Sequence, residues 1–271
     1  MNYVFNVLSE RRRAGAAVML LLLAFFFGYM LSLLVWNAAA YRKPASLPQQ
    51  SPYVYGTYEA TNGVKLHAMG TSPERIVLRA VETNVTETGD YGINGGFFWK
   101  GALLSIAVMN DMPLKGKPHA YGSGWSNIDV PKGTLVWDGG VGRFSVQVAD
   151  AANRLQVTDR ARYWAQGGIS MSLGDDKRWR LQAARERMPQ MDRPKLRSGV
   201  VYEHDQTVWL VVSETPCTAE QFRTAIREQI APGRLADGVF LDGDGSAQMR
   251  SAEVELKGDT RAVYQMMAVE R

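Results

Sequence analysis

Beyond residue 52, apolar and polar positions alternate along most of the chain in short runs. Runs of this kind cover residues 53–59, 64–69, 75–81, 103–109, 134–137, 144–149, 200–202, 207–212 and 263–269. Alternation with a period of two, bounded by Gly, Pro, Asn or Asp, is typical of half-buried β-strands. The pattern therefore predicts a domain built mostly from short strands.

One segment has the helical period instead. Thr218 precedes Gln221 by three residues, the spacing of a capping box, and apolar residues then recur on one face. Pro232 and Gly233 end the run, and an apolar stretch follows at 238–241. We expect a capped helix that packs on a sheet beside a buried strand. The predicted fold class is α+β, mainly a mixed β-sheet with few helices.

The N-terminal segment differs from the rest of the chain. Residues 14–36 carry no charge, and a helix of this length would span roughly 34 Å, more than the ~30 Å of a hydrocarbon core. Arg11, Arg12 and Arg13 precede it directly, which keeps the N-terminus in the cytoplasm. We expect residues 1–13 to be cytoplasmic, 14–36 to form a transmembrane helix or uncleaved signal anchor, 37–52 to be a linker, and 53–271 to form a periplasmic or extracellular domain.

A cleavable signal peptide is the alternative, because Ala38, Ala39 and Ala40 supply small residues after the apolar run. The apolar core of a signal peptide is about 7 to 15 residues long, so the longer run here favours a retained anchor. Both interpretations export the domain.

The net positive charge of the whole chain comes from its N-terminal segment. Residues 1–43 hold five of the 31 Lys and Arg residues and one of the 27 acids, which leaves 26 of each in the exported part. The domain is neutral, and no basic stripe or nucleic-acid motif indicates a nucleic-acid partner. Cys217 is the single cysteine, so the chain has no internal disulfide and no cysteine-based metal cluster.

Three glycine-marked segments lie where strands should end. The first contains Asn94, Gly95 and Gly96; the second, 165–170, reads AQGGIS; the third, 239–249, reads VFLDGDGSAQM. Glycine allows positive φ or close approach of two backbones, and the amide of Asn94 can donate to and accept from a sugar or a phosphate. In the third segment a buried strand delivers a carboxylate to a turn of small residues, where acid–base chemistry is possible. Each segment taken alone is equally compatible with an ordinary structural turn.

Their combination resembles the phosphodiester glycosidase family, the group that includes the lysosomal uncovering enzyme. The resemblance rests on the order NGGFF at 94–98, GGI at 167–169, LRSG at 196–199 and LDGDGS at 241–246, and it covers about residues 53–270. It implies hydrolysis of a sugar-1-phosphodiester on a cell-envelope or surface glycan.

Carried over residue by residue, the resemblance implies the following site. The catalytic candidates are Asp242, Asp244 and Asn94; the substrate-binding candidates are Gly95, Gly96, Gly168, Arg197, Gly243, Gly245 and Ser246. A guanidinium at position 197 could hold two phosphate oxygens at once, although a surface salt bridge is an equally good interpretation. The implied partners are a sugar phosphate or phosphoglycan, and the membrane through the N-terminal helix.

This sequence departs from the family pattern. Asp244 stands where the family has glycine, which puts two carboxyls within two residues and could raise the pKa of one of them. Ser198 follows the arginine, and the stretch 213–216 lacks the aspartate and glycine usual in the family. The alternative function is therefore a catalytically inactive module that binds carbohydrate or phosphoglycan.

We expect no cofactor, with calcium as a minor alternative. Asp242, Asp244 and Glu253 fall at positions 1, 3 and 12 of a loop like that of an EF-hand, but Ala247 replaces its glycine and no helix is expected before it. The chain has no GxSxG elbow, HExxH, P-loop or dinucleotide fingerprint.

The topology predicts the outcome of a reporter experiment. A reporter fused after residue 60 should be active only on the far side of the membrane, because the arginine cluster holds the N-terminus in the cytoplasm. The measurement compares a periplasmic with a cytoplasmic reporter, and activity of the cytoplasmic one would contradict the predicted orientation.

Overall fold

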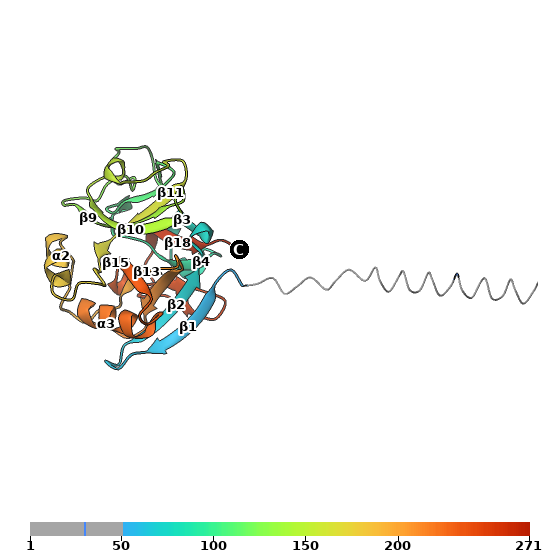
Figure 1. Cartoon of the computed structure of the whole chain (residues 1–271), viewed down its shortest axis with the longest axis vertical. Coiled ribbons are helices and arrows are strands. Elements are labelled where there is room, and N and C mark those ends of the chain that lie inside the picture. Colours follow the sequence, from blue (N-terminus) through green and yellow to red (C-terminus); the bar gives the residue numbers. More distant parts are fainter. Residues whose placement is uncertain (1–29, 31–50) are drawn as a thin grey trace, which may run out of the picture. The chain divides into compact units, whose positions relative to one another are not determined.

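Most strands predicted from the alternating pattern are present in the computed structural model, which describes residue 30 and residues 51–271 (Figure 1). The strands and helices are β1 (Val54–Glu59), β2 (Lys65–Thr71), β3 (Ile76–Thr83), β4 (Tyr91–Asn94), β5 (Phe98–Trp99), β6 (Ala102–Leu103), β7 (Ala107–Met109), β8 (Met112–Pro113), β9 (Lys132–Asp138), β10 (Arg143–Ala149), β11 (Tyr163–Gly167), β12 (Ile169–Ser170), α2 (Trp179–Arg185), β13 (Ser198–Glu203), β14 (Val208–Ser213), α3 (Ala219–Gln229), β15 (Leu235–Phe240), β16 (Met249–Arg250), β17 (Glu255–Leu256) and β18 (Val263–Val269). Short 3-10 turns lie at Pro73–Arg75, Val85–Glu87, Ala152–Arg154 and Asp244–Ser246.

The strands form three larger sheets and one hairpin. The six-stranded sheet A has the order β1-β2-β14-β13-β15-β12, sheet B the order β17-β16-β4-β18-β3, and sheet D the order β10-β9-β11-β7-β8, while β5 and β6 pair alone. Every strand pairing in the described residues is antiparallel, so the expected mixed sheet is wrong. A parallel pair needs a crossover of a dozen or more residues, usually a helix, and the described chain has only two α-helices. The α+β, mainly β character is as predicted.

The central strands of sheet A, β13 and β14, are buried on both faces. One face shares the largest core cluster with side chains of sheets B and D, such as Ile93 and Trp164. The other face packs against α2 and α3 through Trp179, Phe222 and Ile226 (Figure 1). All six residues of β14 are consequently buried, which explains its continuous apolar run.

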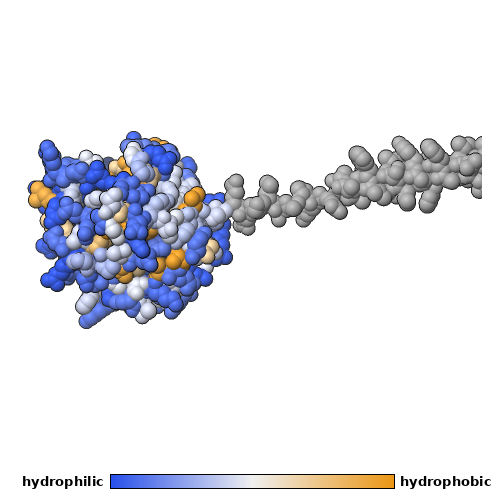
Figure 2. Space-filling view, turned by 90° about the horizontal axis from the view of Figure 1, so that it is seen from below, coloured by the Kyte–Doolittle hydropathy of each residue, from blue (hydrophilic) through white to orange (hydrophobic). Residues whose placement is uncertain are grey.

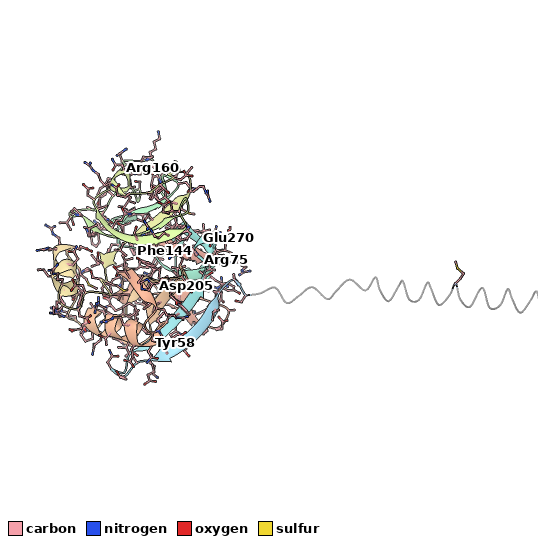
Figure 3. All side chains as sticks on the ribbon, viewed as in Figure 1. Tyr58, Arg75, Phe144, Arg160, Asp205 and Glu270 are labelled. Atoms are coloured by element: carbon pink, nitrogen blue, oxygen red, sulfur yellow. The ribbon has the colours of Figure 1, made fainter. Side chains whose placement is uncertain are left out.

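An aromatic group joins sheet D to sheet A. The ring centroid of Phe144 on β10 lies 4.8 Å from that of Trp137, 5.5 Å from that of Trp164 and 5.0 Å from that of Tyr202 on β13. Figure 3 shows Phe144 in the interior of the domain. The two sheets are thereby packed together at one end of the main core.

The C-terminus is attached to β3. Glu270 donates its backbone N–H to the carbonyl of Arg75 at 2.8 Å, and the two residues lie side by side in Figure 3. The β18 strand has the predicted bounds and pairs with both β3 and β4. The first half of β18 therefore lies beside the Asn94 turn, whereas the end of the chain lies beside Tyr91 and Arg75.

The capping box is confirmed. Thr218 accepts a hydrogen bond from the backbone of Gln221, whose side chain accepts one from the Thr218 N–H, and α3 follows as expected. The predicted strand at 103–109 is instead split into β6 and β7, because the buried Ser105 turns away to accept a hydrogen bond from the Phe97 N–H at 3.0 Å.

The sequence analysis missed α2. This helix has only seven residues and no side-chain N-cap, so it lacks the usual helix signals. Its end is fixed by the buried carboxylate of Glu186, which accepts hydrogen bonds from the N–H of Gly133 and from the N–H and hydroxyl of Ser170. Gln182 adds a fourth hydrogen bond at 2.7 Å. The helix is stabilised by tertiary contacts and not by its own sequence.

The predicted anchor at 14–36 and the cleavage site at 38–40 lie outside the described residues, apart from residue 30. Among the residues that are described, no helix has the length and hydropathy needed to cross a membrane.

We predict that Glu186→Gln destabilises the domain. The amide keeps the shape but places an NH2 group among donors, so at least one buried charge-assisted hydrogen bond is lost, at a cost of about 2 to 3 kcal/mol. Thermal unfolding should show a lower Tm by several degrees. The exposed Glu59→Gln is the matched control; an equal Tm for both variants would show that the buried contacts contribute no stability.

Candidate active site

The main chain of Asp242 is held by three parts of the fold, just beyond the end of β15. Its N–H donates to the carbonyl of Gly95 at 3.2 Å. Its carbonyl accepts hydrogen bonds from Nδ2 of Asn94 at 2.7 Å and from the hydroxyl of Ser198 at 2.6 Å. Because β4, β13 and β15 all contribute, this residue lies where sheet B meets the end of sheet A.

The three glycine-marked segments do come together here. A Cβ added to Gly96 would lie 2.6 Å from the carbonyl oxygen of Gly167, and one added to Gly95 would lie 2.6 Å from Cγ of Gln265. A Cβ on Gly168 would overlap the carbonyl oxygen of Phe240. None of these three glycines has positive φ, so close approach is the property that requires glycine: approach of another backbone at Gly96 and Gly168, and of the Gln265 side chain at Gly95.

The carboxyl of Asp242 has an unusual environment. Burial raises its pKa to about 6, and the nearby Ser246 hydroxyl and the Arg261 guanidinium offset only part of this rise. The residue as a whole nevertheless keeps some solvent-accessible surface. A desolvated carboxyl on a residue that is not fully buried is a candidate acid or base.

Several polar atoms next to this carboxyl have no partner. The fully buried Oγ of Ser246 lies near enough to the Asp242 carboxyl to offset part of the rise in its pKa but forms no hydrogen bond of normal geometry with any residue that the structure describes. The two amide atoms of Gln265, beside Gly95, form none either. Unpaired buried polar atoms are costly, and each one in a native protein needs an explanation. Their location beside Asp242 and Gly95 indicates a site that is completed by water or by a bound molecule.

The backbone at Asp244 explains the departure from the family pattern. Asp244 has φ of +56°, in the left-handed region where glycine is favoured and Asp is tolerated. Its side chain is 55% exposed and pairs with Nζ of Lys195 at 2.9 Å. Of the influences on the pKa of Asp242, the charge of Asp244 is the smallest. The two carboxyls therefore do not act as a tightly coupled pair.

The other members of this turn are closely packed. A Cβ on Gly243 would lie 2.8 Å from the carbonyl oxygen of Leu196, and one on Gly245 would overlap the carboxylate of Asp259. Asp259 in turn is paired with Arg261 through Nε at 2.9 Å. Gly243 and Gly245 thus allow the 195–197 segment and the 257–261 turn to approach Asp242.

Arg197 is buried and bonded to main-chain carbonyls. Its Nε donates to Cys217 at 3.1 Å, and its Nη2 donates to Gln190 and Arg193 at 2.5 and 2.9 Å. Burial lowers the pKa of its guanidinium. Only Nη1 is left without a partner among the described residues, so the edge that could grip two phosphate oxygens is largely occupied. The surface salt bridge considered from the sequence is not formed.

The side chain of Asn94 forms its hydrogen bonds with the main chain of the domain. Its Nδ2 donates to the carbonyls of Asp242 and Gly95, and its Oδ1 accepts from the N–H of Gln248 at 3.1 Å. With 1% of its surface exposed, it positions the turn that carries Asp242.

The loop considered for calcium has different surroundings from an EF-hand. A strand, β15, precedes it and another, β16, follows, while Glu253 accepts a hydrogen bond from the Tyr53 hydroxyl at 3.1 Å. Within the part of the chain that the structure describes, no group of three or more His, Cys, Asp or Glu side chains is arranged to hold a metal ion.

The structure adds residues that the sequence did not single out. Arg261 and Lys195 bring positive charge to the turn, and Gln265 brings an unpartnered amide. They come from the loop before β18, the loop before β13 and β18 itself, which no short motif connects to Asp242. The stretch 177–195 contains five arginines, at positions 178, 180, 185, 187 and 193. The helix α2 lies in its first half, and its last residue, Lys195, pairs with Asp244.

Comparison with known proteins supports the fold and leaves the family open. No protein-family model and no curated protein matches the chain. The catalytic domain of zebrafish N-acetylglucosamine-1-phosphodiester alpha-N-acetylglucosaminidase, auto-inhibited by its pro-peptide, superposes with a TM-score of 0.55 at 12% identity, over 84% of this chain and 86% of that one. A hypothetical protein from Synechocystis gives a TM-score of 0.45 at 14% identity over 80% of this chain and 61% of that one; a putative exported protein from Burkholderia pseudomallei gives 0.35 at 11% over 82% and 58%. The domain thus has a fold like that of the zebrafish catalytic domain.

Proposed function

We propose that the domain hydrolyses a sugar-1-phosphodiester of a cell-envelope or surface glycan, with Asp242 as the catalytic residue. The carboxylate of Asp242 takes a proton from water as the water oxygen bonds to the anomeric carbon. The bond from that carbon to the bridging oxygen breaks, and its electron pair leaves with the phosphate. The products are a free reducing sugar and a phosphate monoester.

The observation that carries this proposal is the raised pKa of Asp242 together with its partial exposure. A general base works best when its pKa lies near the working pH, and an ordinary aspartate is too weak a base. Burial brings this carboxyl closer to that range, with the main chain fixed by Asn94 and Ser198. The charge of the leaving phosphate would be met by two cations near this turn, Arg261 and Lys195, which in the structure are paired with Asp259 and Asp244.

The fold supports the same reaction class. The zebrafish domain with the similar fold is named for the cleavage of an N-acetylglucosamine phosphodiester. At 12% identity this likeness concerns the backbone, so the proposal depends on the site residues and is tested on them.

Asp242→Asn should abolish turnover and leave the fold intact. The amide keeps the shape and removes the charge, and general acid–base catalysis alone is worth about 10² to 10⁴ in rate. The assay is release of reducing sugar by the full-length protein in detergent from methyl esters of a panel of sugar-1-phosphates. If the unmodified protein binds these esters without releasing sugar, the enzyme proposal fails and the binding module is left.

The raised pKa also predicts two effects of pH. Activity of the unmodified protein should rise as the pH increases through about 6, where Asp242 becomes ionised. Because the folded state holds this proton more tightly than the unfolded state, stability is lost as the pH rises from the unfolded value of 3.8 through about 6. Asp242→Asn should therefore raise the Tm at pH 8. The corresponding gain in the free energy of unfolding is at most about 3 kcal/mol. An unchanged Tm would show that the carboxyl is not desolvated.

Asp244→Gly should stabilise the turn without loss of activity. Glycine adopts positive φ without strain, whereas a non-glycine residue in the left-handed region costs about 1 kcal/mol or more. Loss of the exposed pair with Lys195 offsets less than about 1 kcal/mol. Thermal unfolding and the sugar-release assay measure the two effects; a large loss of turnover would instead assign a catalytic role to Asp244.

A further inference from the structure

Two aromatic side chains are exposed on neighbouring segments of the domain. Trp99 is 63% exposed and Tyr121 is 71% exposed. Among the large apolar side chains that are exposed in the described residues, these two are the aromatic ones. Trp99 pairs with Ala102 across the β5–β6 hairpin. A Cβ on Gly122 would lie 2.7 Å from that of Ala102, which places Tyr121 beside the same hairpin.

The backbones that carry these rings are fixed. Lys100 and Gly101 both have positive φ, as in the tight turn of a two-residue hairpin. Leu103 donates its N–H to the carbonyl of Gly122 at 3.0 Å, and Nζ of Lys115 donates to the carbonyl of Gly101 at 3.2 Å. The rings are thus presented by rigid turns, and a ligand would meet a surface that needs little ordering.

The surroundings of the rings are cationic. Nζ of Lys100 lies 5.7 Å from the centre of the Trp99 ring, and Lys117 is exposed in the loop that leads to Tyr121. Lys115 also belongs to this group but is paired with Glu82 at 3.1 Å. Lys100 and Lys117 therefore leave a positive charge beside the rings. Figure 2 shows another feature of the surface: on the face in view, it is mostly hydrophilic with only small apolar patches.

This aromatic patch (Trp99, Tyr121, Lys100 and Lys117) is connected to Asp242 through Gly95 and a short stretch of chain. Gly95, whose carbonyl accepts from the Asp242 N–H at 3.2 Å, precedes Trp99 by four residues. Four residues span at most about 14 Å. A molecule bound at Asp242 would need to extend by only a few sugar units to reach the patch.

We infer that the aromatic patch is a binding site for the glycan chain of an anionic phosphoglycan, separate from the point of cleavage. The apolar face of a sugar ring packs on the exposed aromatic rings, and the phosphate groups are attracted by the two lysines. The inference deepens the proposed function and rests on it for the substrate class, since the patch would hold the part of the glycan that is not released.

The test compares binding of full-length protein in detergent to yeast phosphomannan and to the same mannan after removal of phosphate. Trp99→Ala should weaken binding of both polymers by about tenfold, as expected for the loss of a central aromatic contact. Lys100→Gln combined with Lys117→Gln should weaken binding of phosphomannan only. Leu181→Ala and Lys177→Gln, exposed residues in or near α2, are the matched controls and should bind as the unmodified protein does.

The outcomes separate this inference from the proposed function. Sugar release from small methyl esters should be within twofold of normal in the Trp99 and lysine variants, because those esters do not reach the patch. If the unmodified protein binds phosphomannan through Trp99 but releases no sugar from any substrate, the aromatic patch is supported as a glycan-binding site and the enzyme proposal fails. Three results would contradict glycan binding at the aromatic patch. They are unchanged polymer binding by Trp99→Ala, no binding of either polymer by the unmodified protein, and an equal loss of sugar release from small esters in the variants.

Discussion

The main chain of Asp242 is the point on which the arrangement of the domain depends. Its carbonyl receives Asn94 from sheet B and Ser198 from sheet A, and its N–H reaches Gly95. Buried hydrogen bonds of this kind cannot be given up without leaving unpaired donors, so the two sheets are locked in one relative position. Several glycines around it are a consequence, because at Gly96, Gly168 and Gly243 another backbone approaches more closely than a Cβ allows.

Much of the fold could be predicted because it depends on local pattern. The strand β18 has the bounds expected from its alternation, and α3 begins at the expected capping box. The helix α2 could not be predicted, since the Glu186 contacts that stabilise it come from residues far away in the sequence. The order of the strands in the sheets could not be predicted from the sequence either, because pairing between β2 and β14 joins residues more than a hundred positions apart.

The candidate site could also be predicted from the sequence only in part. The motifs indicated Asp242 and the glycines, and the structure brings these together. What the motifs could not indicate is how each polar side chain is used. Asn94 and Arg197 have the residue types of substrate-binding groups, yet most of their hydrogen bonds go to the protein's own main chain. Arg261, by contrast, reaches the Asp242 turn from a loop that carries no motif.

The turn at 242–246 is also where local preference and structure conflict most. Asp242 is a desolvated acid, Asp244 has a backbone conformation that favours glycine, and the buried Ser246 hydroxyl forms no hydrogen bond of normal geometry. Elsewhere, as in α3 and β14, residue preference and structure agree. A fold tolerates such conflicts where the surrounding structure over-determines them, and they concentrate at functional sites. Three unfavourable features within five residues, on a turn held from three strands, therefore point to a turn that is kept for its chemistry and not for its contribution to stability.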